Sequence, residues 1–348
     1  MILLQRALVA ELTGPAVDVR KVRDSLQQAI ALEHATIPPY LYALYSLAPG
    51  RNVEIAQIIQ SVVLEEMLHM TLSSNVLNAL GGTPRLDAPD FIPTYPGPLP
   101  GGVESDLMVH LAPFSMPQLQ TFLKIEEPEH PLNFKAGLTA EETITIGQFY
   151  TAISDAIARL GNAAFVHPPR NQVGPDVMPN AIVVTDVATA QQAIKTIIDQ
   201  GEGTSTSPDA GVGGGYAHYY RFMQIQKQRL LVATPGGVQP ELDYAYQGAA
   251  VPFDPTGVYA APTDPGAAPG YPAGSAQAFA NDNFNYAYTC LLKALQALFS
   301  RDPGQQQFDR TLGLMMSLKG QAKAMMSGSP NPAVITGPSF QYQPTNPS

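Results

Sequence analysis

Residues 62–82 read VVLEEMLHMTLSSNVLNALGG, and this stretch is the clearest indication of the fold of the chain. Apolar residues recur in it at the three- and four-residue spacing of one helix face, and the glycine pair at its end is a helix stop signal. Glu66 follows Val62 by four residues and precedes His69 by three, so both polar residues share the apolar face. The stretch therefore predicts a core helix that has an acid and an imidazole on its buried side.

Apolar spacing on both sides of this stretch predicts a mainly α-helical chain. The expected long helices of the core span residues 17–47, 53–80, 140–160 and 215–231. Shorter elements are expected between them, as helices over 117–125 and 188–200 and strands over 107–111 and 182–184. Two further helices are expected near the C-terminus, over 276–299 and 305–326. The fold class that follows is a four-helix bundle with long insertions and an additional C-terminal helical hairpin.

Composition divides the chain into four segments. Residues 1–235 form the expected helical core with its insertions, and residues 236–275 form a proline- and glycine-rich loop that wraps the surface. Residues 276–326 form a helix pair packed on the core, and residues 327–348 form a loosely ordered tail rich in proline, serine and asparagine.

The charge balance limits the range of partners. The chain has 19 basic and 29 acidic residues and a net charge of −10, which disfavours binding to nucleic acid or to an anionic membrane. No run of about 18 apolar residues occurs, and the N-terminal apolar run is too short for a signal peptide, so a cytoplasmic protein is expected. Cys290 is the single cysteine, which excludes an intrachain disulfide and a cysteine-based zinc site.

Glu33 places another acid on a buried face. It follows Leu26 by seven residues and precedes Ile37 by four, so it lies on the apolar stripe of the first expected helix. A bare carboxylate in a protein core costs roughly several kcal/mol unless it is paired or binds a metal ion. Bundles that bind two iron or manganese ions place glutamates and Glu-x-x-His pairs on facing helices in this way. An oxygen and nitrogen ligand set of this kind suits iron or manganese, whereas softer metals favour thiolate.

The Glu-x-x-His spacing alone is a weak signal. The chain contains a second copy, Glu127 to His130, with one proline inside it and another after it, and this copy is expected to be a loop. For Glu66 and His69, a core histidine hydrogen-bonded to a neighbouring acid is as compatible with the spacing as a metal site is.

Longer motifs extend the comparison beyond spacing. Five stretches are involved: ALEHATIPPYLYALYSL at 31–47, VVLEEMLHMTLSSNVLNALGG at 62–82, FLKIEEPE at 122–129, TIGQFY at 145–150 and AHYYRF at 217–222. Together they resemble a bacterial ferritin-like family that includes the ferritin-like region of iminophenyl-pyruvate dimer synthase, from violacein- and rebeccamycin-type bisindole pathways. The resemblance covers about residues 20–235 and implies a four-helix ferritin-like core with a dinuclear metal site. The best-known chemistry of the family is oxidative coupling of imines derived from aromatic amino acids.

The resemblance also implies which residues bind the metal. Carried over by position, these ligands are Glu33 in the first helix, Glu66 and His69 in the second, and His218 in the fourth. Two positions depart from the family pattern, because Gln148 and Gly215 stand where the family has glutamates in the third and fourth helices. Two divalent cations about 3.5–4 Å apart need the negative charge that these departures remove. The expected content is therefore one iron or manganese ion per chain.

These observations predict a ferritin-like metalloprotein, an oxidoreductase that acts on a small substrate, such as one derived from an aromatic amino acid, in specialised metabolism. The expected partner is that small-molecule substrate, with a homodimer left open and with neither nucleic acid nor membrane. The alternative is a non-catalytic ferritin-like scaffold or binding protein, in which Gln148 and Gly215 mark the loss of the dinuclear site. Iron storage is disfavoured, because the large Pro/Gly-rich insertions would obstruct a storage shell.

Overall fold

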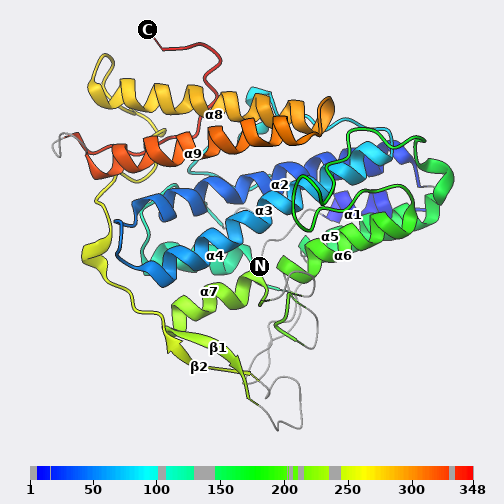
Figure 1. The fold of residues 1–348 in the computed structure, drawn as a ribbon, viewed down its shortest axis with the longest axis horizontal. Helices are drawn as coiled ribbons and strands as arrows, with labels where there is room; N and C mark the ends of the chain where they lie inside the picture. Colours follow the sequence, from blue (N-terminus) through cyan, green and yellow to red (C-terminus); the bar gives the residue numbers. More distant parts are fainter. Residues whose placement is uncertain are drawn as a thin grey trace.

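The computed structural model describes residues 6–15, 17–100, 107–128, 146–201, 203, 207–210, 215–234, 244–328 and 334–347. In these ranges the chain forms helices α1–α9 and one two-stranded antiparallel sheet (Figure 1). The mainly helical character expected from the apolar spacing is confirmed. Among the helices of the described ranges, none is long and apolar enough to cross a membrane.

Two long helices form the centre of the bundle. Helix α2 (Val19–Ser46) and helix α3 (Val53–Ala79) run side by side (Figure 1), and both begin and end within two residues of the expected bounds. The side chain of Asp18 accepts a hydrogen bond from the backbone N–H of Arg20 and caps the start of α2. Gly81, with a φ of 79°, follows the end of α3 as a helix-terminating glycine.

Shorter helices flank this pair at its two ends. Helices α4 (Met116–Ile125) and α7 (His218–Lys227) pack on each other and against one end of the α2–α3 pair (Figure 1). Helices α5 (Ile146–Leu160) and α6 (Val187–Gly201) pack together at the other end, and the short α1 (Arg6–Thr13) contacts α2 and α5. In the described ranges the connections contain 3₁₀ turns at Pro89–Phe91, Asn162–Ala164 and Pro255–Gly257.

The C-terminal helical hairpin is confirmed. Helix α8 (Ala276–Ser300) and helix α9 (Gln305–Ser327) lie across α2 and α3, on the side opposite α4 and α7 (Figure 1). Their bounds lie within one residue of those expected. The hydroxyl of Ser275 accepts a hydrogen bond from the backbone N–H of Ala278 and caps α8.

Two prolines lie inside α2 without ending it. Pro39 has no backbone N–H, so the carbonyl of Ala35 loses its helical partner. The hydroxyl of the buried Tyr95 donates a hydrogen bond to that carbonyl over 2.6 Å. Helix α2 therefore stays continuous through its buried half with the help of a hydrogen bond from outside the helix.

The two strands expected between the core helices are not formed. Residues 107–111 make one isolated bridge, and residues 182–184 make none. In the second segment the backbone N–H of Val184 donates to the side-chain oxygen of Gln172 over 2.8 Å. A side chain thus accepts a backbone hydrogen bond that a neighbouring strand would accept in a sheet.

The fourth long helix, expected over 215–231, is shorter at both ends. Gln228 adopts a left-handed conformation, with a φ of 54°, and ends α7. The residues that follow form β1 (Arg229–Ala233), which pairs antiparallel with β2 (Tyr244–Ala250). Strand β2 lies within 236–275, where the composition predicts a wrapping loop.

Candidate metal centre

Helices α2 and α3 place three polar side chains at the centre of the molecule. Glu33 lies halfway along α2, and Glu66 and His69 lie halfway along α3. All three are buried, as their positions on apolar stripes predicted. Nδ1 of His69 lies 3.6 Å from Oε2 of Glu33 and 3.9 Å from Oε2 of Glu66. Ligand atoms from the three residues lie within 4.8 Å of one another, as a shared ion requires.

A second group of side chains shares Glu66 with the first. His218 occupies the first turn of α7, and Glu126 caps the C-terminal end of α4. Nδ1 of His218 lies 2.9 Å from Oε1 of Glu66 and 3.3 Å from Oε2 of Glu126, and all three residues are buried. One oxygen of Glu66 therefore faces each histidine. The two groups form one cluster with Glu66 in the middle.

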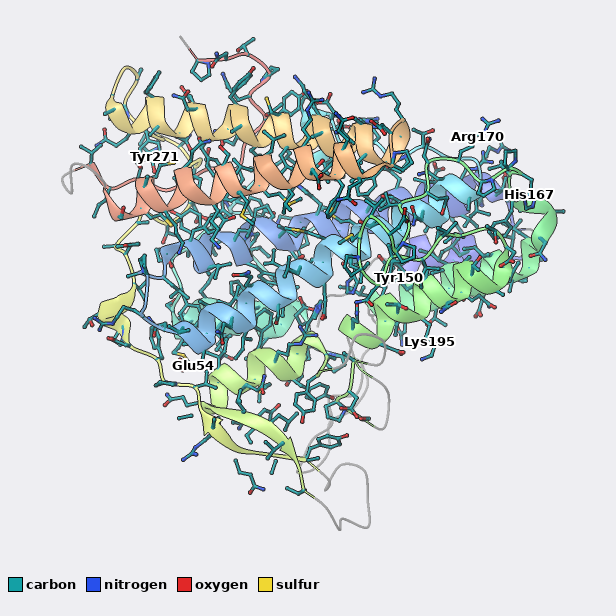
Figure 2. The ribbon with its side chains drawn as sticks, viewed as in Figure 1. Glu54, Tyr150, His167, Arg170, Lys195 and Tyr271 are labelled. Atoms are coloured by element: carbon teal, nitrogen blue, oxygen red, sulfur yellow. The ribbon has the colours of Figure 1, made fainter. Side chains whose placement is uncertain are left out.

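The ends of four short helices meet at this cluster. Helix α4 ends beside Glu126, and α7 begins at His218. Helix α6 ends beside Gln200, and α5 brings in Tyr150 from its second turn, at the end that faces α2 and α3 (Figure 2). Two long helices thus supply the central side chains, and the ends of the short helices supply the rest.

Both histidines turn Nδ1 toward the cluster. Nε2 of His69 donates to Oε1 of Gln200 over 3.0 Å, and Nε2 of His218 donates to Oε2 of Glu65 over 3.1 Å. Arg221 also donates to Oε2 of Glu65, over 2.5 Å. Since amide and carboxylate oxygens only accept, each Nε2 has a hydrogen and each Nδ1 is the nitrogen that remains for a cation. Outer partners of this kind orient metal-binding histidines.

Each outer carboxylate accepts a hydrogen bond from a buried tyrosine. The hydroxyl of Tyr150 donates to Oε1 of Glu33 over 2.6 Å, and the hydroxyl of Tyr40 donates to Oε1 of Glu126. In both acids Oε1 is thereby occupied, and Oε2 faces the nearer histidine. The tyrosines therefore fix which oxygen each acid presents to the cluster.

Burial and mutual charge set the protonation of the cluster. Burial, and next the charge of Glu126, raise the pKa of Glu66 well above its usual value. Burial opposes the charged form of His218, but the charge and hydrogen bond of Glu126 outweigh it and raise the pKa of His218 well above its usual value. Burial also opposes ionisation of Glu33, but the hydrogen bond and charge of His69 outweigh it and lower the pKa of Glu33. Without a cation, protons take the place of positive metal charge in this cluster.

The cluster lines a small cavity and fits a metal ion. The cavity volume is about 30 Å³, which is enough for small occupants of the size of water. Oε2 of Glu66 is buried there and has no hydrogen-bond partner in the part of the chain that the structure describes. Buried polar atoms are normally paired, so an unpaired carboxylate oxygen beside imidazole nitrogen suits a cation. The donor set of carboxylate and imidazole suits iron or manganese.

The two positions that depart from the family pattern lie outside the cluster. Gln148 is half-buried on α5 and does not line the cavity, whereas Tyr150, two residues later, does. Gly215 is exposed, with a φ of 92°, and precedes the start of α7. A side chain at 215 would therefore not share a helix face with His218. The family's ligand pattern therefore does not carry over to these two positions.

Sequence reasoning missed Glu126, although a signal was present. Glu126 follows Phe122 by four residues and Leu119 by seven, which places it on the buried face of α4 by the same spacing that identified Glu33. Of the second Glu-x-x-His copy, Glu127 lines the cavity, and His130 lies outside the described residues.

Fold and site together define a class: helical-bundle proteins with carboxylates and histidines clustered between their helices. A family model described as ferritin-like matches residues 26–227, more than half of the chain. The chain belongs to this ferritin-like family.

A solved structure supports the same fold. The crystal structure of a ferritin-like protein from Caulobacter vibrioides is similar to this chain with a TM-score of 0.65 and 24% sequence identity. The match covers 94% of this chain and 100% of that one, and at this identity it establishes the fold alone. No curated protein matches the chain in sequence. The ferritin-like fold is confirmed, and the narrower link to iminophenyl-pyruvate dimer synthase stays a prediction.

Proposed function

We propose that the protein is a ferritin-like metalloenzyme, an oxidoreductase that binds iron or manganese at this cluster and acts on a small substrate. The observation that supports this best is the orientation of the two histidines, which both present Nδ1 to the cluster and donate through Nε2 to an outer partner. A core histidine that served only packing would not require this arrangement twice. When bound, ions of this kind supply redox chemistry that side chains lack.

We further propose two ions per chain, with Glu66 shared between them. Glu33, Glu66 and His69 would bind one ion, and Glu66, Glu126 and His218 would bind the other. The expectation of one ion rested on a charge count that omitted Glu126. With three carboxylates in the cluster, the anionic charge is larger than that count allowed.

The surrounding side chains hold the ligands and bury one side of the cluster. Three aromatic rings pack edge to face or tilted beside the α4–α7 end of the cluster, with centroids 4.6–5.5 Å apart: Tyr40, Phe122 and Phe222. All three rings are buried. A buried, pre-arranged environment of this kind strengthens electrostatic interactions at the site.

The substrate is proposed to lie at the rim of the cavity. A volume of about 30 Å³ has room for ions and a very small molecule, and it does not admit an organic substrate. Half-buried residues at its edge are Glu127, Ile146, Ile198 and Gly201. The two isoleucines of the rim are compatible with a substrate derived from an aromatic amino acid. The resemblance to enzymes of specialised metabolism is the reason to test such compounds.

A non-catalytic scaffold is the competing function. It would need a polar cluster that is satisfied without metal, whereas Oε2 of Glu66 has no hydrogen-bond partner among the described residues. This unpaired carboxylate oxygen favours a metal-binding site over a non-catalytic scaffold.

Elemental analysis of protein purified without added metal tests the proposal. The expected result is iron or manganese at about two ions per chain. Glu66→Gln should remove both ions, because it replaces the shared ligand. Glu54→Gln is the matched control, since Glu54 lies exposed in the first turn of the same helix, far from the cluster (Figure 2). A wild-type chain that binds neither iron nor manganese, even after reconstitution, would exclude the metalloenzyme.

A further inference from the structure

The two histidines of the cluster bond to different kinds of outer partner. Nε2 of His69 donates to the amide oxygen of Gln200 over 3.0 Å, whereas Nε2 of His218 donates to a carboxylate oxygen of Glu65 over 3.1 Å. An amide is neutral, and an ionised carboxylate is an anion. A hydrogen bond to an ionised acceptor is roughly twice as strong as one to a neutral acceptor, and it makes a ligating imidazole more basic. His218 is therefore the stronger donor toward a cation at its Nδ1.

Arg221 keeps Glu65 charged and in place. Its guanidinium donates to the same oxygen of Glu65 over 2.5 Å, to the hydroxyl of Ser61 over 3.1 Å and to the backbone carbonyl of Tyr216. A guanidinium is always charged, so it favours the ionised form of a neighbouring carboxylate. It also offsets part of the negative charge of Glu65, but the atom that accepts from His218 remains an anionic oxygen. These bonds fix the outer partner of His218 between α3 and α7.

The opening of the cavity lies mainly on the side of His69. Three of the four half-buried residues that line the cavity lie on α5 and α6: Ile146, Ile198 and Gly201. The fourth is Glu127, which follows the end of α4. Helices α5 and α6 also supply Tyr150 and Gln200, which hydrogen-bond to Glu33 and His69. The group that contains His69 is therefore the one that faces the rim.

The surroundings of His218 are closed by comparison. Of the described residues of α7, only His218 lines the cavity. The buried rings of Tyr40, Phe122 and Phe222 pack on one another at the α4–α7 end of the cluster. The two groups thus differ in two independent respects, the charge of the outer partner and the access from the rim.

We propose that the two ions have different roles: the ion between Glu66, Glu126 and His218 is retained tightly, and the ion between Glu33, Glu66 and His69 is held more weakly and faces the substrate. This assignment rests on the proposed two-ion function and adds the order of loading to it. When metal is scarce, the position at His218 fills first. The supply of metal then sets how many chains have a complete centre.

Stepwise loading by itself does not distinguish the two positions. Two cations that share Glu66 repel each other, so the second ion binds more weakly than the first in any centre of this kind. Variants that keep one position each make the comparison. Glu33→Gln removes a carboxylate from the position at His69, and Glu126→Gln removes one from the position at His218. Each variant retains Glu66, one further carboxylate and one histidine, so the two are matched in charge.

Competition with a chelator of known affinity for manganous ion measures the remaining site of each variant. Each variant is expected to bind one ion, and Glu33→Gln should bind it about tenfold more tightly than Glu126→Gln, the lower end of the effect of an outer partner. Equal affinities, tighter binding by Glu126→Gln, or a count other than one ion in either variant would overturn the proposal. A wild-type chain that binds fewer than two ions would overturn the two-ion function itself, and this assignment with it.

Replacement of Glu65 tests whether the carboxylate causes the difference. Glu65→Gln should weaken binding about tenfold in the Glu33→Gln background, where the ion lies at His218. It should leave the affinity unchanged in the Glu126→Gln background, where no ion lies at His218. Equal weakening in both backgrounds would show that Glu65 acts on the fold in general and would overturn its link to His218.

The reverse exchange places a carboxylate behind His69. Gln200→Glu in the Glu126→Gln background should tighten binding about tenfold. Gln192→Glu is the matched control, because Gln192 is exposed on the same helix and should not alter the affinity. Circular dichroism shows whether each variant is folded. Unchanged affinity in a folded Gln200→Glu variant would overturn the role of the outer charge.

Azide, a small anion that can bind a metal ion, tests which position faces the opening. Cobaltous ion suits the same nitrogen and oxygen ligands, and its visible absorption reports an added ligand. Azide should change the spectrum of cobalt-loaded Glu126→Gln, whose ion lies at His69, and leave that of Glu33→Gln unchanged. Equal changes in the two variants, or a change in Glu33→Gln alone, would overturn the assignment of the open position.

Discussion

Glu126 raises the number of carboxylates in the cluster from two to three. Its Oε2 lies 3.3 Å from Nδ1 of His218, and its Oε1 accepts from Tyr40, so the carboxylate is held in one orientation. Without it, the second group would consist of the shared Glu66 and one histidine. The proposal of a second ion therefore depends on this acid at the end of α4.

Glu126→Gln is expected to halve the metal content, from about two ions to about one per chain. The amide keeps the size of the side chain but loses the negative charge that a second cation needs. Elemental analysis after reconstitution with ferrous or manganous ion measures the change. Glu127→Gln, at the neighbouring residue, should retain full metal content, and a full complement of metal in Glu126→Gln would contradict the assignment.

Glu65 is expected to act through His218 rather than on the metal itself. Glu65→Ala removes the acceptor for Nε2 of His218 and the partner of Arg221, so the imidazole loses its fixed orientation. Metal affinity should fall by about 10–100-fold, as is typical for outer partners of ligating histidines. Competition with a chelator of known affinity measures the loss. Glu65→Gln keeps an acceptor oxygen and should recover part of the affinity, whereas equal affinity in all three proteins would leave Glu65 without a positioning role.

Single residues differ in how far the sequence could identify them. Glu33 and Glu66 could be predicted because an acid on an apolar stripe is a local signal. Gln200 could not, because its hydrogen bond to His69 spans 131 positions in the sequence and depends on the packing of α6 against α3. Glu65 sits beside Glu66 on a half-exposed face of α3 and has no local pattern that marks it.

At the scale of elements, the start of α7 decides which positions can reach the cluster. The helix begins at His218, and Gly215 lies before it in an exposed left-handed conformation. An i, i+3 pair needs both residues on the same helix, so the family-type Glu-x-x-His cannot form here by substitution at 215 alone.

Gly215→Glu is accordingly expected to leave the metal content unchanged. The new side chain would point into open space, because nothing lies within 4 Å of a Cβ added at this position. A positive φ disfavours a residue with a side chain, so the free energy of unfolding should fall by about 1 kcal/mol. Metal analysis and denaturant titration measure both effects. A gain in metal content would show that α7 extends toward 215 in solution.

The hydrogen bond from Tyr95 to Ala35 predicts a stability effect within α2. Tyr95→Phe would leave a buried carbonyl opposite Pro39 unpaired and should lower the free energy of unfolding by about 1–3 kcal/mol. Urea denaturation followed by circular dichroism measures the loss. Tyr259→Phe, at a half-buried tyrosine, is the control and should change stability by less than about 0.5 kcal/mol. If both variants are equally stable, a water molecule or a local bend satisfies that carbonyl instead.

Helices were predictable as elements and strands were not. Helical periodicity is local, and it placed α2, α3, α8 and α9 within two residues of their observed bounds. Residues 182–184 look like a strand by composition, but side chains take their backbone hydrogen bonds. The sequence assigned most of strand β1 to the expected fourth helix, because the short apolar run Leu230–Val232 fits a helix or a strand equally well. Its pairing partner β2 comes later in the chain, so no local pattern indicated the strand.

At the scale of the whole molecule, one continuous apolar core joins the bundle to the hairpin. Buried residues of α2 and α3 belong to the same cluster as Phe284, Leu292 and Leu318 of the hairpin. Burial of this core is the main source of stability. The candidate metal centre is a small polar cluster within it.

Removal of the metal by a chelator is therefore expected to lower the melting temperature without unfolding the protein. Any ligand that binds only the folded state stabilises it, so its loss lowers stability, while the apolar core remains. The far-ultraviolet circular dichroism spectrum should retain its helical signal at 25 °C. The melting temperature in a thermal scan should fall by roughly several degrees. Glu66→Gln should show no shift on chelation. Loss of helical signal at 25 °C would show that the metal is structural.

The ends of four short helices meet at the middle of two unbroken helices, so the ligands and the rim of the cavity lie on different elements. Glu33, Glu66 and His69 sit on a rigid frame, whereas Ile146 and Ile198 belong to short helices at the rim. Mutations at the rim can reshape the entrance while the frame keeps its geometry. If the protein is the proposed enzyme, its choice of substrate can change through rim mutations without changes to the metal ligands, and a combinatorial library limited to the rim tests this.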